Sequence, residues 1–257
     1  MGIFDTHAHY WRSDFGEELD ALLKELPSKN VEKVVAVGCD LPSSEEEIEL
    51  AARYDHIYAA VGFHPENAGK VPENWESELI KLLSRDKVVA LGEIGLDYHY
   101  EDGPPKEVQK DVFIKQLEIA QSHNLPVIIH SRDAMGDTLD ILKKYKPKGV
   151  MHCFSGSAES ALEVVRLGMY IGFTGVLTFK NAKKAQAACA AVPTELLLLE
   201  TDCPYMAPVP HRGERSDSSM IAFTAAKMAE IKGVSTEEMI EIARENAERL
   251  FFNDIGQ

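Results

Sequence analysis

Eight short apolar runs, separated by segments of helical length, constrain the fold of this 257-residue chain more than any other feature. The runs are rich in Val, Ile and Leu and show no polar alternation, which is typical of parallel strands buried on both faces. They predict eight strands: Ile3–His9, Val34–Gly38, Ile57–Phe63, Val88–Glu93, Pro126–His130, Gly149–Cys153, Tyr170–Thr174 and Leu196–Thr201.

The segments between these runs have apolar residues at the three-and-four spacing of amphipathic helices. Some carry start signals, such as Ser43-Ser44-Glu45-Glu46, which is typical of a capped first turn. The pattern predicts helices at Phe15–Leu26, Ser43–Tyr54, Asn74–Leu83, Lys106–His123, Ala134–Tyr145, Ala158–Leu167, Ala182–Ala191, Ser219–Lys232 and Ser235–Phe252.

Eight strand-then-helix units have one common closed arrangement, the (β/α)₈ TIM barrel of the α/β class. The length suits one such barrel as a single domain over residues 1–257, and the chain has no low-complexity tract or linker-like stretch. An open, doubly wound sheet is the alternative arrangement of the same units.

The charge balance limits the classes of function. With 42 acidic and 27 basic residues the formal charge is −15, which argues against holding nucleic acid by bulk positive charge but allows a phosphate site built on metal ions. No apolar run approaches the roughly 20 residues of a membrane span, and the N-terminus lacks signal-peptide features. The four cysteines form no Cys-x-x-Cys pair, so we expect reduced thiols in a cytoplasmic protein, with no sign of an obligate protein partner.

Side chains that can bind metals stand at the ends of six expected strands, where a barrel places its active-site face. His7 and His9 are two residues apart on one strand, so both imidazoles project from the same side. The complete set is His7, His9, His64, Glu93, His130, His152 and Asp202.

Imidazoles and carboxylates without a required thiolate favour divalent metals with nitrogen and oxygen ligands. Glu93 could bridge two cations, and Asp202 could bind a metal, accept a proton from water, or do both. Glu200 shares the face of Asp202 and is interpreted as support for it. Cys153 and Cys203 flank candidate ligands but are expected to be small core residues.

Six motifs together resemble the signatures of the TatD family of metal-dependent deoxyribonucleases, and they follow one another over nearly the whole chain. They are Phe4-Asp5-Thr6-His7-Ala8-His9, Gly62-Phe63-His64-Pro65, Gly92-Glu93-Ile94-Gly95-Leu96-Asp97-Tyr98, His130-Ser131-Arg132-Asp133, His152-Cys153-Phe154-Ser155-Gly156 and Glu200-Thr201-Asp202-Cys203-Pro204-Tyr205.

This resemblance implies a TIM barrel of the amidohydrolase superfamily that hydrolyses phosphodiester bonds in DNA, as a 3′–5′ exonuclease on single-stranded ends. It implies two divalent ions, with Mg²⁺ expected first and Mn²⁺ or Zn²⁺ as alternatives. Glu93, Asp202 and His64 are then the catalytic residues. The implied metal ligands are His7, His9, Glu93, His130, His152 and Asp202.

The resemblance also suggests substrate contacts. His64 resembles a phosphate-side histidine, and Arg132 resembles a residue that lines the cleft, where it could meet phosphate or pair with Asp133. Tyr205 and Arg212 complete the predicted substrate-binding set, and Asp97 is expected to support the ligands.

One departure from the family pattern leaves the substrate preference open. The family's usual Arg-Gly-Lys-Arg-Asn-Glu-Pro run is here Arg212-Gly213-Glu214-Arg215 followed by Ser216-Asp217-Ser218. Basic side chains of this loop could reach phosphate or lie in solvent. Trp11 could stack on a base or pack in the first loop, and Lys180, Lys183 and Lys184 could guide a strand or form a solvated helix face.

Two other functions fit the same residues. One is hydrolysis of another ester or amide bond, such as aminoacyl-tRNA deacylation. Amide hydrolysis is less expected, because superfamily members that open amide rings have a metal-bridging lysine at the position of Glu93. The nearest lysine of this chain, Lys87, lies at the opposite end of that strand. The other is a non-enzymatic scaffold, which the complete ligand set argues against.

Overall fold

The computed structural model describes residues 2–252 and contains eight strands in one sheet, paired in parallel in the order β1 to β8. This arrangement confirms the predicted single-domain (β/α)₈ barrel and excludes the open, doubly wound alternative, in which the strand order would be permuted. The strands are β1 (Ile3–Ala8), β2 (Val31–Val37), β3 (Ile57–Val61), β4 (Val88–Asp97), β5 (Val127–Arg132), β6 (Gly149–Met151), β7 (Tyr170–Phe173) and β8 (Leu197–Leu199).

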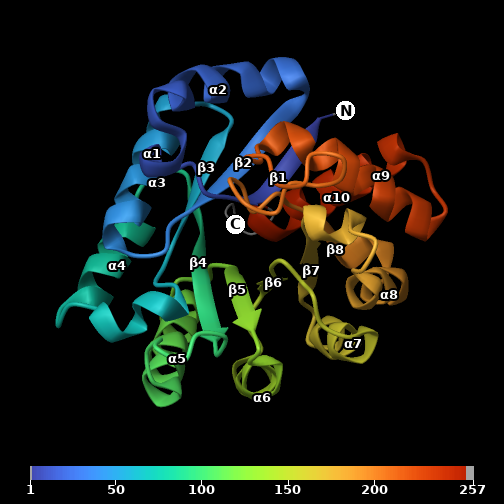
Figure 1. Cartoon of the computed structure of the whole chain (residues 1–257). Helices are drawn as coiled ribbons and strands as arrows, with labels where there is room; N and C mark the ends of the chain where they lie inside the picture. The colour runs from blue at the N-terminus through green and yellow to red at the C-terminus, as the bar shows by residue number, and fades with distance from the viewer. Residues whose placement is uncertain (1, 253–257) are drawn as a thin grey trace.

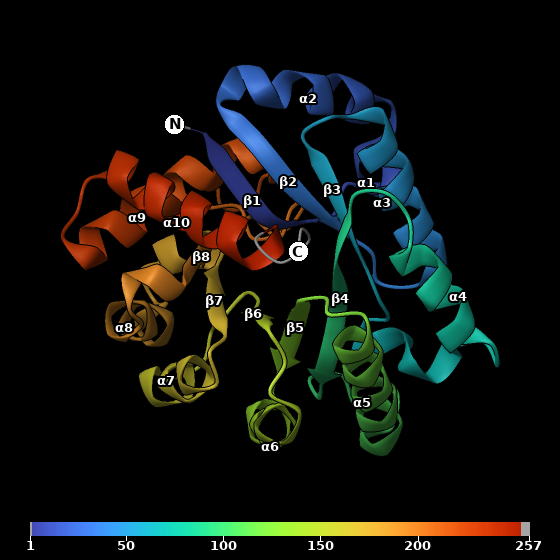
Figure 2. The ribbon, with the colours of Figure 1, turned by 180° about the vertical axis from the view of Figure 1, so that it is seen from behind.

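The helices lie outside the strands and form a ring around them (Figures 1 and 2). Within residues 2–252, no helix combines the length and the apolar character that a bilayer span requires. The helices are α1 (Arg12–Phe15), α2 (Leu19–Glu25), α3 (Leu41–Arg53), α4 (Trp75–Leu83), α5 (Lys106–Ser122), α6 (Met135–Tyr145), α7 (Ala158–Arg166), α8 (Lys183–Ala191), α9 (Ile221–Lys232) and α10 (Thr236–Phe251).

The barrel closes where β8 meets β1, and this seam is held mainly by bonds outside the regular ladders. The Asp5 carboxylate accepts hydrogen bonds from the Thr201 hydroxyl (2.6 Å) and the Thr201 amide (3.0 Å). The Asp202 amide donates to the carbonyl of His7 (2.9 Å), and the His9 amide donates to that of Cys203 (2.7 Å). These bonds bring the end of β8 directly against His7 and His9.

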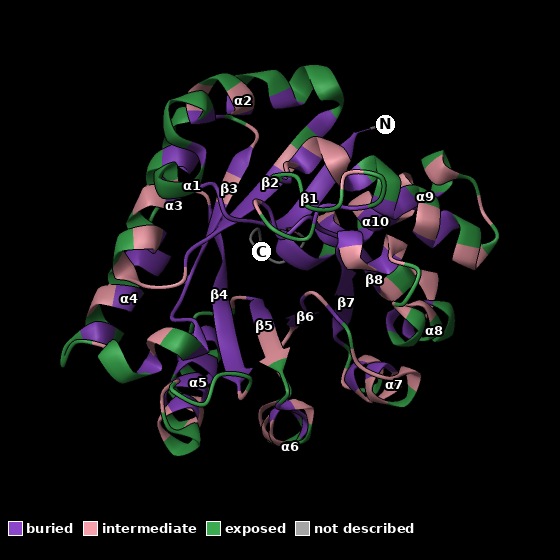
Figure 3. Cartoon of the chain, in the orientation of Figure 1, coloured by how far each residue is buried: buried purple, intermediate pink, exposed green. Residues whose placement is uncertain are grey.

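Most strand residues are buried on both faces, as their continuous apolar sequences predict, and most exceptions lie at the start of β2 and the end of β5 (Figure 3). Val34 and Ala36 of β2 belong to a core between the strands and the helices, whereas Val35 and Val37 of the same strand belong to a separate cluster. That second cluster also contains Leu250 and Phe251 of α10, which packs against β8 and β1.

The predicted helix at Phe15–Leu26 is wrong as a single element, because the chain forms α1, a 3₁₀ turn and then α2. Gly16 has a φ of 59°, a left-handed conformation that interrupts a right-handed helix and that glycine adopts at little cost. The predicted capped turn at Ser43 is also displaced, since Asp40 is the N-cap of α3 and accepts a hydrogen bond from the Ser43 amide (2.9 Å).

Two expected strand ends lie inside longer strands. β4 continues for four residues beyond Glu93, to Asp97, and β5 continues for two residues beyond His130, to Arg132. The two strands pair with each other along these extensions. In contrast, β6 and β8 end earlier than expected, so His152 and Asp202 stand on the segments that follow them. Asp202 has a φ of 58°, which turns the chain sharply at this point.

Candidate metal centre

Glu93 lies at the middle of a buried group of histidines, and its two carboxylate oxygens face different members. Oε2 lies 3.5 Å from Nε2 of His7 and 3.7 Å from Nε2 of His9. Oε1 lies 2.8 Å from Nδ1 of His130 and 3.3 Å from Nε2 of His152. The carboxylate therefore divides the centre into two halves.

The first half is built from the seam of β1 and β8. Nε2 of His7 and Nε2 of His9 lie 3.1 Å apart, as their positions on one strand face require. Oδ1 of Asp202 lies 3.7 Å from the first and 3.5 Å from the second. The Nδ1 atom of His9 donates to the carbonyl of Val37 (2.7 Å), which leaves Nε2 as an acceptor that faces the centre.

The second half is built from the ends of β5 and β6, and carboxylates hold its histidines. Nε2 of His130 lies 3.0 Å from Oδ2 of Asp97, and Nδ1 of His152 lies 3.2 Å from Oε1 of Glu200. Such carboxylate–histidine pairs fix the tautomer and the orientation of an imidazole that binds a metal through its other nitrogen. The structure thus places Asp97 beside His130 and Glu200 beside His152, where each carboxylate can orient an imidazole.

His64 approaches the second half from the end of β3, with Nε2 3.8 Å from Oε1 of Glu93. Its Nδ1 accepts a hydrogen bond from the amide of Glu66 (3.2 Å), so the proton of the neutral ring is on Nε2. Burial lowers the pKa of His64 to about 3, which keeps the ring neutral at ordinary pH. His64 is therefore a hydrogen-bond donor directed into the centre.

The ionisable side chains of the centre strongly affect one another's pKa values. Burial opposes the protonation of His130, but the hydrogen bonds to Asp97 and Glu93 raise its pKa to about 9. Burial likewise favours neutral carboxyl groups, yet the neighbouring histidines outweigh it and lower the pKa of both Glu93 and Asp202. The centre thus keeps its carboxylates ionised inside the barrel, a state that bound cations would favour further.

The donor set fits divalent metals. A tetrahedral ion with ligands at about 2.0–2.1 Å separates them by roughly 3.3–3.4 Å, and the distances among His7, His9, Glu93 and Asp202 range from 3.1 to 3.7 Å. The atoms that face one another are imidazole nitrogens and carboxylate oxygens, the ligands that favour Zn²⁺, Mn²⁺ and Mg²⁺.

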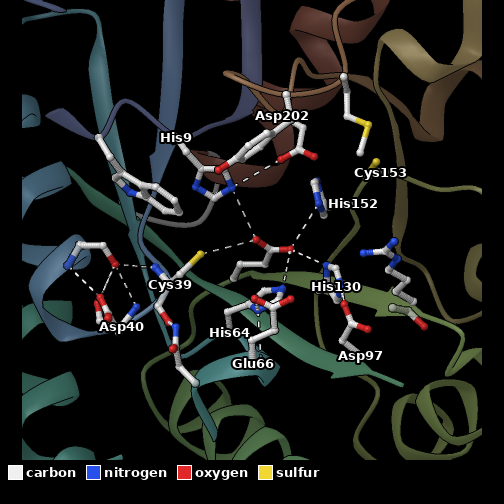
Figure 4. Close-up of a pocket in the computed structure, with 18 of the residues that line it drawn as sticks. His9, Cys39, Asp40, His64, Glu66, Asp97, His130, His152, Cys153 and Asp202 are labelled. Atoms are coloured by element: carbon white, nitrogen blue, oxygen red, sulfur yellow. Dashed lines mark hydrogen bonds and ion pairs between the residues drawn. The ribbon is translucent and has the colours of Figure 1, made fainter. Parts of the chain in front are cut away.

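The centre forms the floor of a cavity of about 950 Å³. Figure 4 shows His9 and Asp202 on one side of it and His64 and His130 on the other. Arg132 and Tyr205, two of the predicted substrate contacts, line this cavity, as does Trp11. Arg132 does not pair with Asp133, which binds His99 instead; its Nη1 donates to the hydroxyl of Tyr100 (3.2 Å).

The basic part of the loop between β8 and α9, residues 211–215, is absent from the residues that line the cavity. The guanidinium of Arg212, a predicted substrate contact, packs over the ring of Phe179 at 4.5 Å. Arg215 pairs with Glu18, and Nδ1 of His211 lies 2.9 Å from Oε2 of Glu214. Lys180, Lys183 and Lys184 are also absent from the residues that line the cavity. The structure thus does not bring this loop's basic groups to the centre.

Two cysteines line the cavity, one against expectation and one without any. Cys153 lines the cavity instead of packing in the core, because the backbone after β6 turns with a φ of 44° at this residue and ends the strand alternation. Cys39 also lines it and was missed by the sequence reasoning. Its position at the end of β2 is the signal that could have identified it, since other strand ends supply the candidate ligands. Cys203 is buried as expected.

Comparisons with known proteins identify the family of this chain. The family model described as TatD related DNase matches residues 4–252. A protein of Bacillus subtilis described as the uncharacterized metal-dependent hydrolase YabD is 43% identical over 252 residues, which cover 97% of this chain and 98% of that protein. The uncharacterized metal-dependent hydrolase YcfH of Escherichia coli K12 is 39% identical, over 100% of this chain and 98% of that protein.

The crystal structure of YjjV, a TatD homologue from Escherichia coli K12, superposes with a TM-score of 0.91 at 32% identity, covering 97% of each chain. The family match extends over nearly all described residues, and both relatives align with nearly the full length of the chain. The chain belongs to the family of TatD-related DNases.

Proposed function

We propose that this chain is a metal-dependent hydrolase that cleaves phosphodiester bonds in DNA and acts as a 3′–5′ exonuclease on single-stranded ends. The observation that carries the proposal is the division of the Glu93 carboxylate between two sets of histidines, 3.5 and 3.7 Å from one oxygen and 2.8 and 3.3 Å from the other. Membership of the TatD-related DNases supports the choice of DNA, and the relatives' names support metal dependence.

The two halves of the centre would each hold one ion, with Glu93 shared between them. His7, His9 and Asp202 would bind the first, and His130 and His152 the second. When bound, two divalent ions supply Lewis acidity toward phosphate oxygens and lower the pKa of water. Asp97 and Glu200 keep the second pair of imidazoles oriented for this role.

Asp202 would accept the proton of the attacking water. Hydrogen bonding to His9 and the charges of neighbouring histidines outweigh burial and lower its pKa, so the carboxylate is ionised and available as a base. Its left-handed backbone conformation directs the side chain from the barrel seam toward His7 and His9.

His64 and Arg132 would position the phosphate. The neutral His64 ring presents its Nε2–H beside Glu93 and can donate to a phosphate oxygen without adding charge. Arg132 stands at the mouth of the cavity, where its guanidinium lies 5.2 Å from the ring of Tyr100. Tyr205 lines the same mouth and is 49% exposed, which leaves its ring open for stacking on a base.

Digestion of end-labelled single-stranded DNA tests the proposal, with Mg²⁺ or Mn²⁺ present or removed by a chelator. We expect shortening from the 3′ end that requires metal, and Glu93→Ala should abolish it because both halves of the centre lose their shared ligand. Glu45→Ala, which removes an exposed carboxylate on α3, is the matched control and should retain full activity.

A panel of substrates separates this reaction from hydrolysis of other esters. The protein could leave DNA intact but deacylate aminoacyl-tRNA, with Glu93→Ala abolishing the deacylation. That result would support the role of the metal centre and disprove the nuclease assignment. Unchanged DNA cleavage by Glu93→Ala would disprove the role of the centre itself.

A further inference from the structure

Cys39 is held rigidly at the edge of the metal centre by its backbone. Its amide donates to Oγ of Ser43 (2.9 Å) in the first turn of α3. Its carbonyl accepts from the amide of His64 (2.9 Å) and from Nδ2 of Asn67 (2.9 Å). The backbone at Cys39 is thus fixed to the start of α3 and to the segment that follows β3.

The thiol faces the same half of the centre as His7 and His9. Sγ of Cys39 lies 3.9 Å from Oε2 of Glu93, the carboxylate oxygen that those histidines approach. Sγ, this oxygen and a ring nitrogen of His9 lie within 4.8 Å of one another, so three ligand types converge on one point. Figure 4 shows Cys39 directed into the cavity, with a dashed line from its sulfur.

We propose that Cys39 is an additional ligand of the ion held by His7, His9 and Asp202, and that it makes this half selective for a thiolate-binding metal of the Zn²⁺ class over Mg²⁺. A thiolate is a soft donor that Zn²⁺ binds at about 2.3 Å, whereas Mg²⁺ takes oxygen ligands and retains water. On binding, the S–H bond breaks, its proton leaves to solvent, and a sulfur–metal bond forms.

The spacing around Glu93 agrees with such a ligand. The separations of Oε2 from Nε2 of His7, Nε2 of His9 and Sγ of Cys39 are 3.5, 3.7 and 3.9 Å. The sulfur atom is the farthest of the three, and a sulfur ligand also lies about 0.2–0.3 Å farther from zinc than a nitrogen ligand does. Sγ of Cys39, a ring nitrogen of His9 and a carboxylate oxygen of Glu93 lie close enough to one another to share one ion.

The other cysteines provide internal contrasts. Cys189 is buried within α8, remote from the cavity lining, which is the ordinary place of a small apolar core residue. Cys153 lines the cavity on its other side, and its Sγ lies 3.5 Å from the hydroxyl of Thr174. Cys153 is grouped with His152 and Asp202, whereas Cys39 is grouped with His9 and Glu93, so the two thiols face different ligands and the experiment must separate them.

Cobalt substitution of the whole protein tests the inference. Co²⁺ bound by a thiolate gives a near-ultraviolet sulfur-to-metal charge-transfer band that nitrogen and oxygen ligands do not produce. We expect this band in the wild-type protein, its loss in Cys39→Ala and Cys39→Ser, and its retention in Cys189→Ala and Cys153→Ala. Thermal unfolding of the cobalt-free variants establishes that each has folded.

Metal titration gives the second measurement. Cys39→Ala should lower the affinity for Zn²⁺ by tenfold or more, at least about the loss that follows removal of a supporting partner, and should leave the Mg²⁺ affinity unchanged. A band that is absent from wild type, or that persists in Cys39→Ala, would overturn the inference, as would an equal loss of Zn²⁺ and Mg²⁺ affinity. The inference rests on the metal centre of the proposed function but not on its substrate, so failure of DNA cleavage would leave these measurements meaningful.

If Cys39→Ala and Cys39→Ser do not fold, X-ray absorption of the zinc-loaded wild-type protein replaces them. A sulfur neighbour at about 2.3 Å from zinc supports a thiolate ligand, and Cys153→Ala should retain it. A first shell of nitrogen and oxygen alone would overturn the inference.

Discussion

The two halves of the metal centre are built in different ways. In the half at the β1–β8 seam, the backbone sets the positions: His7 and His9 share one strand, Nδ1 of His9 is held by the carbonyl of Val37, and the Asp202 amide bonds to the carbonyl of His7. In the half at β5 and β6, buried carboxylates hold the imidazoles. Side-chain substitutions can therefore remove the supports of the second half, whereas they leave the backbone hydrogen bonds of the first half in place.

The largest effect is expected from Glu200→Ala. The Glu200 carboxylate is fully buried, pairs with Nδ1 of His152 and accepts a hydrogen bond from the amide of Cys153. Loss of one member of a buried pair typically costs about 3–5 kcal/mol, so urea unfolding should show a loss of about 3 kcal/mol or more. In the first half, by contrast, Nδ1 of His9 is held by the backbone carbonyl of Val37, which a side-chain substitution does not remove.

Gly172→Ala tests the same support from the opposite side. A Cβ atom at this position would lie 2.3 Å from Oε2 of Glu200, so the carboxylate would have to move. The variant should therefore reproduce the loss of stability caused by Glu200→Ala, and the two losses should not add. Additive losses would show that Glu200 is not held against β7 as the structure has it.

A smaller and more selective effect is expected from Asp97→Asn. The substitution keeps the shape of the side chain but weakens its hold on Nε2 of His130 (3.0 Å). Removal of such a partner typically lowers metal affinity about 10- to 100-fold, and calorimetry with Mn²⁺ should show this loss for one of two ions. Glu66→Gln, an exposed carboxylate at the cavity, is the matched control. Equal weakening of both ions would remove the distinction between the halves.

The acid–base properties of His130 predict how the second half responds to pH. Its pKa, raised to about 9 by Asp97 and Glu93, exceeds the ordinary value for histidine, so below about pH 9 a proton occupies the ring and opposes a cation. Mn²⁺ affinity should therefore rise with pH by up to about tenfold per unit and level off above the pKa. In Asp97→Asn this plateau should begin at lower pH, and an unchanged profile would show that Asp97 does not control the proton.

The two halves also differ in how much of their structure the sequence predicts. The eight apolar runs predict the barrel because both faces of its strands are buried, and the His-x-His spacing predicts the first half because one strand carries both rings. The paired extensions of β4 and β5 are not encoded locally, because they depend on contacts between distant segments. For the same reason the sequence shows Glu200 beside Asp202, whereas in the fold Glu200 contacts His152.

The thiols and the basic loop were the least predictable parts of the site. Cys39 is one residue past an apolar strand, and only the fold shows that it faces Glu93. Cys153 was assigned to the core by strand alternation, which fails because its backbone is left-handed. Arg212 lies in a basic loop near Asp202 in the sequence, yet its guanidinium packs on Phe179. In these cases, closeness along the sequence did not predict where the side chain points in the fold.

The smallest expected effect compares the arginines of two regions outside the centre. Arg132 lines the cavity mouth, whereas Arg212 covers Phe179, so only the first is placed to meet a phosphate of bound DNA. An exposed charge pair contributes up to about 1 kcal/mol, so Arg132→Ala should raise KM for single-stranded DNA by about fivefold at low salt. The difference should shrink as salt screens it, while Arg212→Ala should match wild type throughout. If Arg212→Ala instead produced the salt-dependent loss, DNA would bind across the loop before α9, and the phosphate contact that we assign to Arg132 would be wrong.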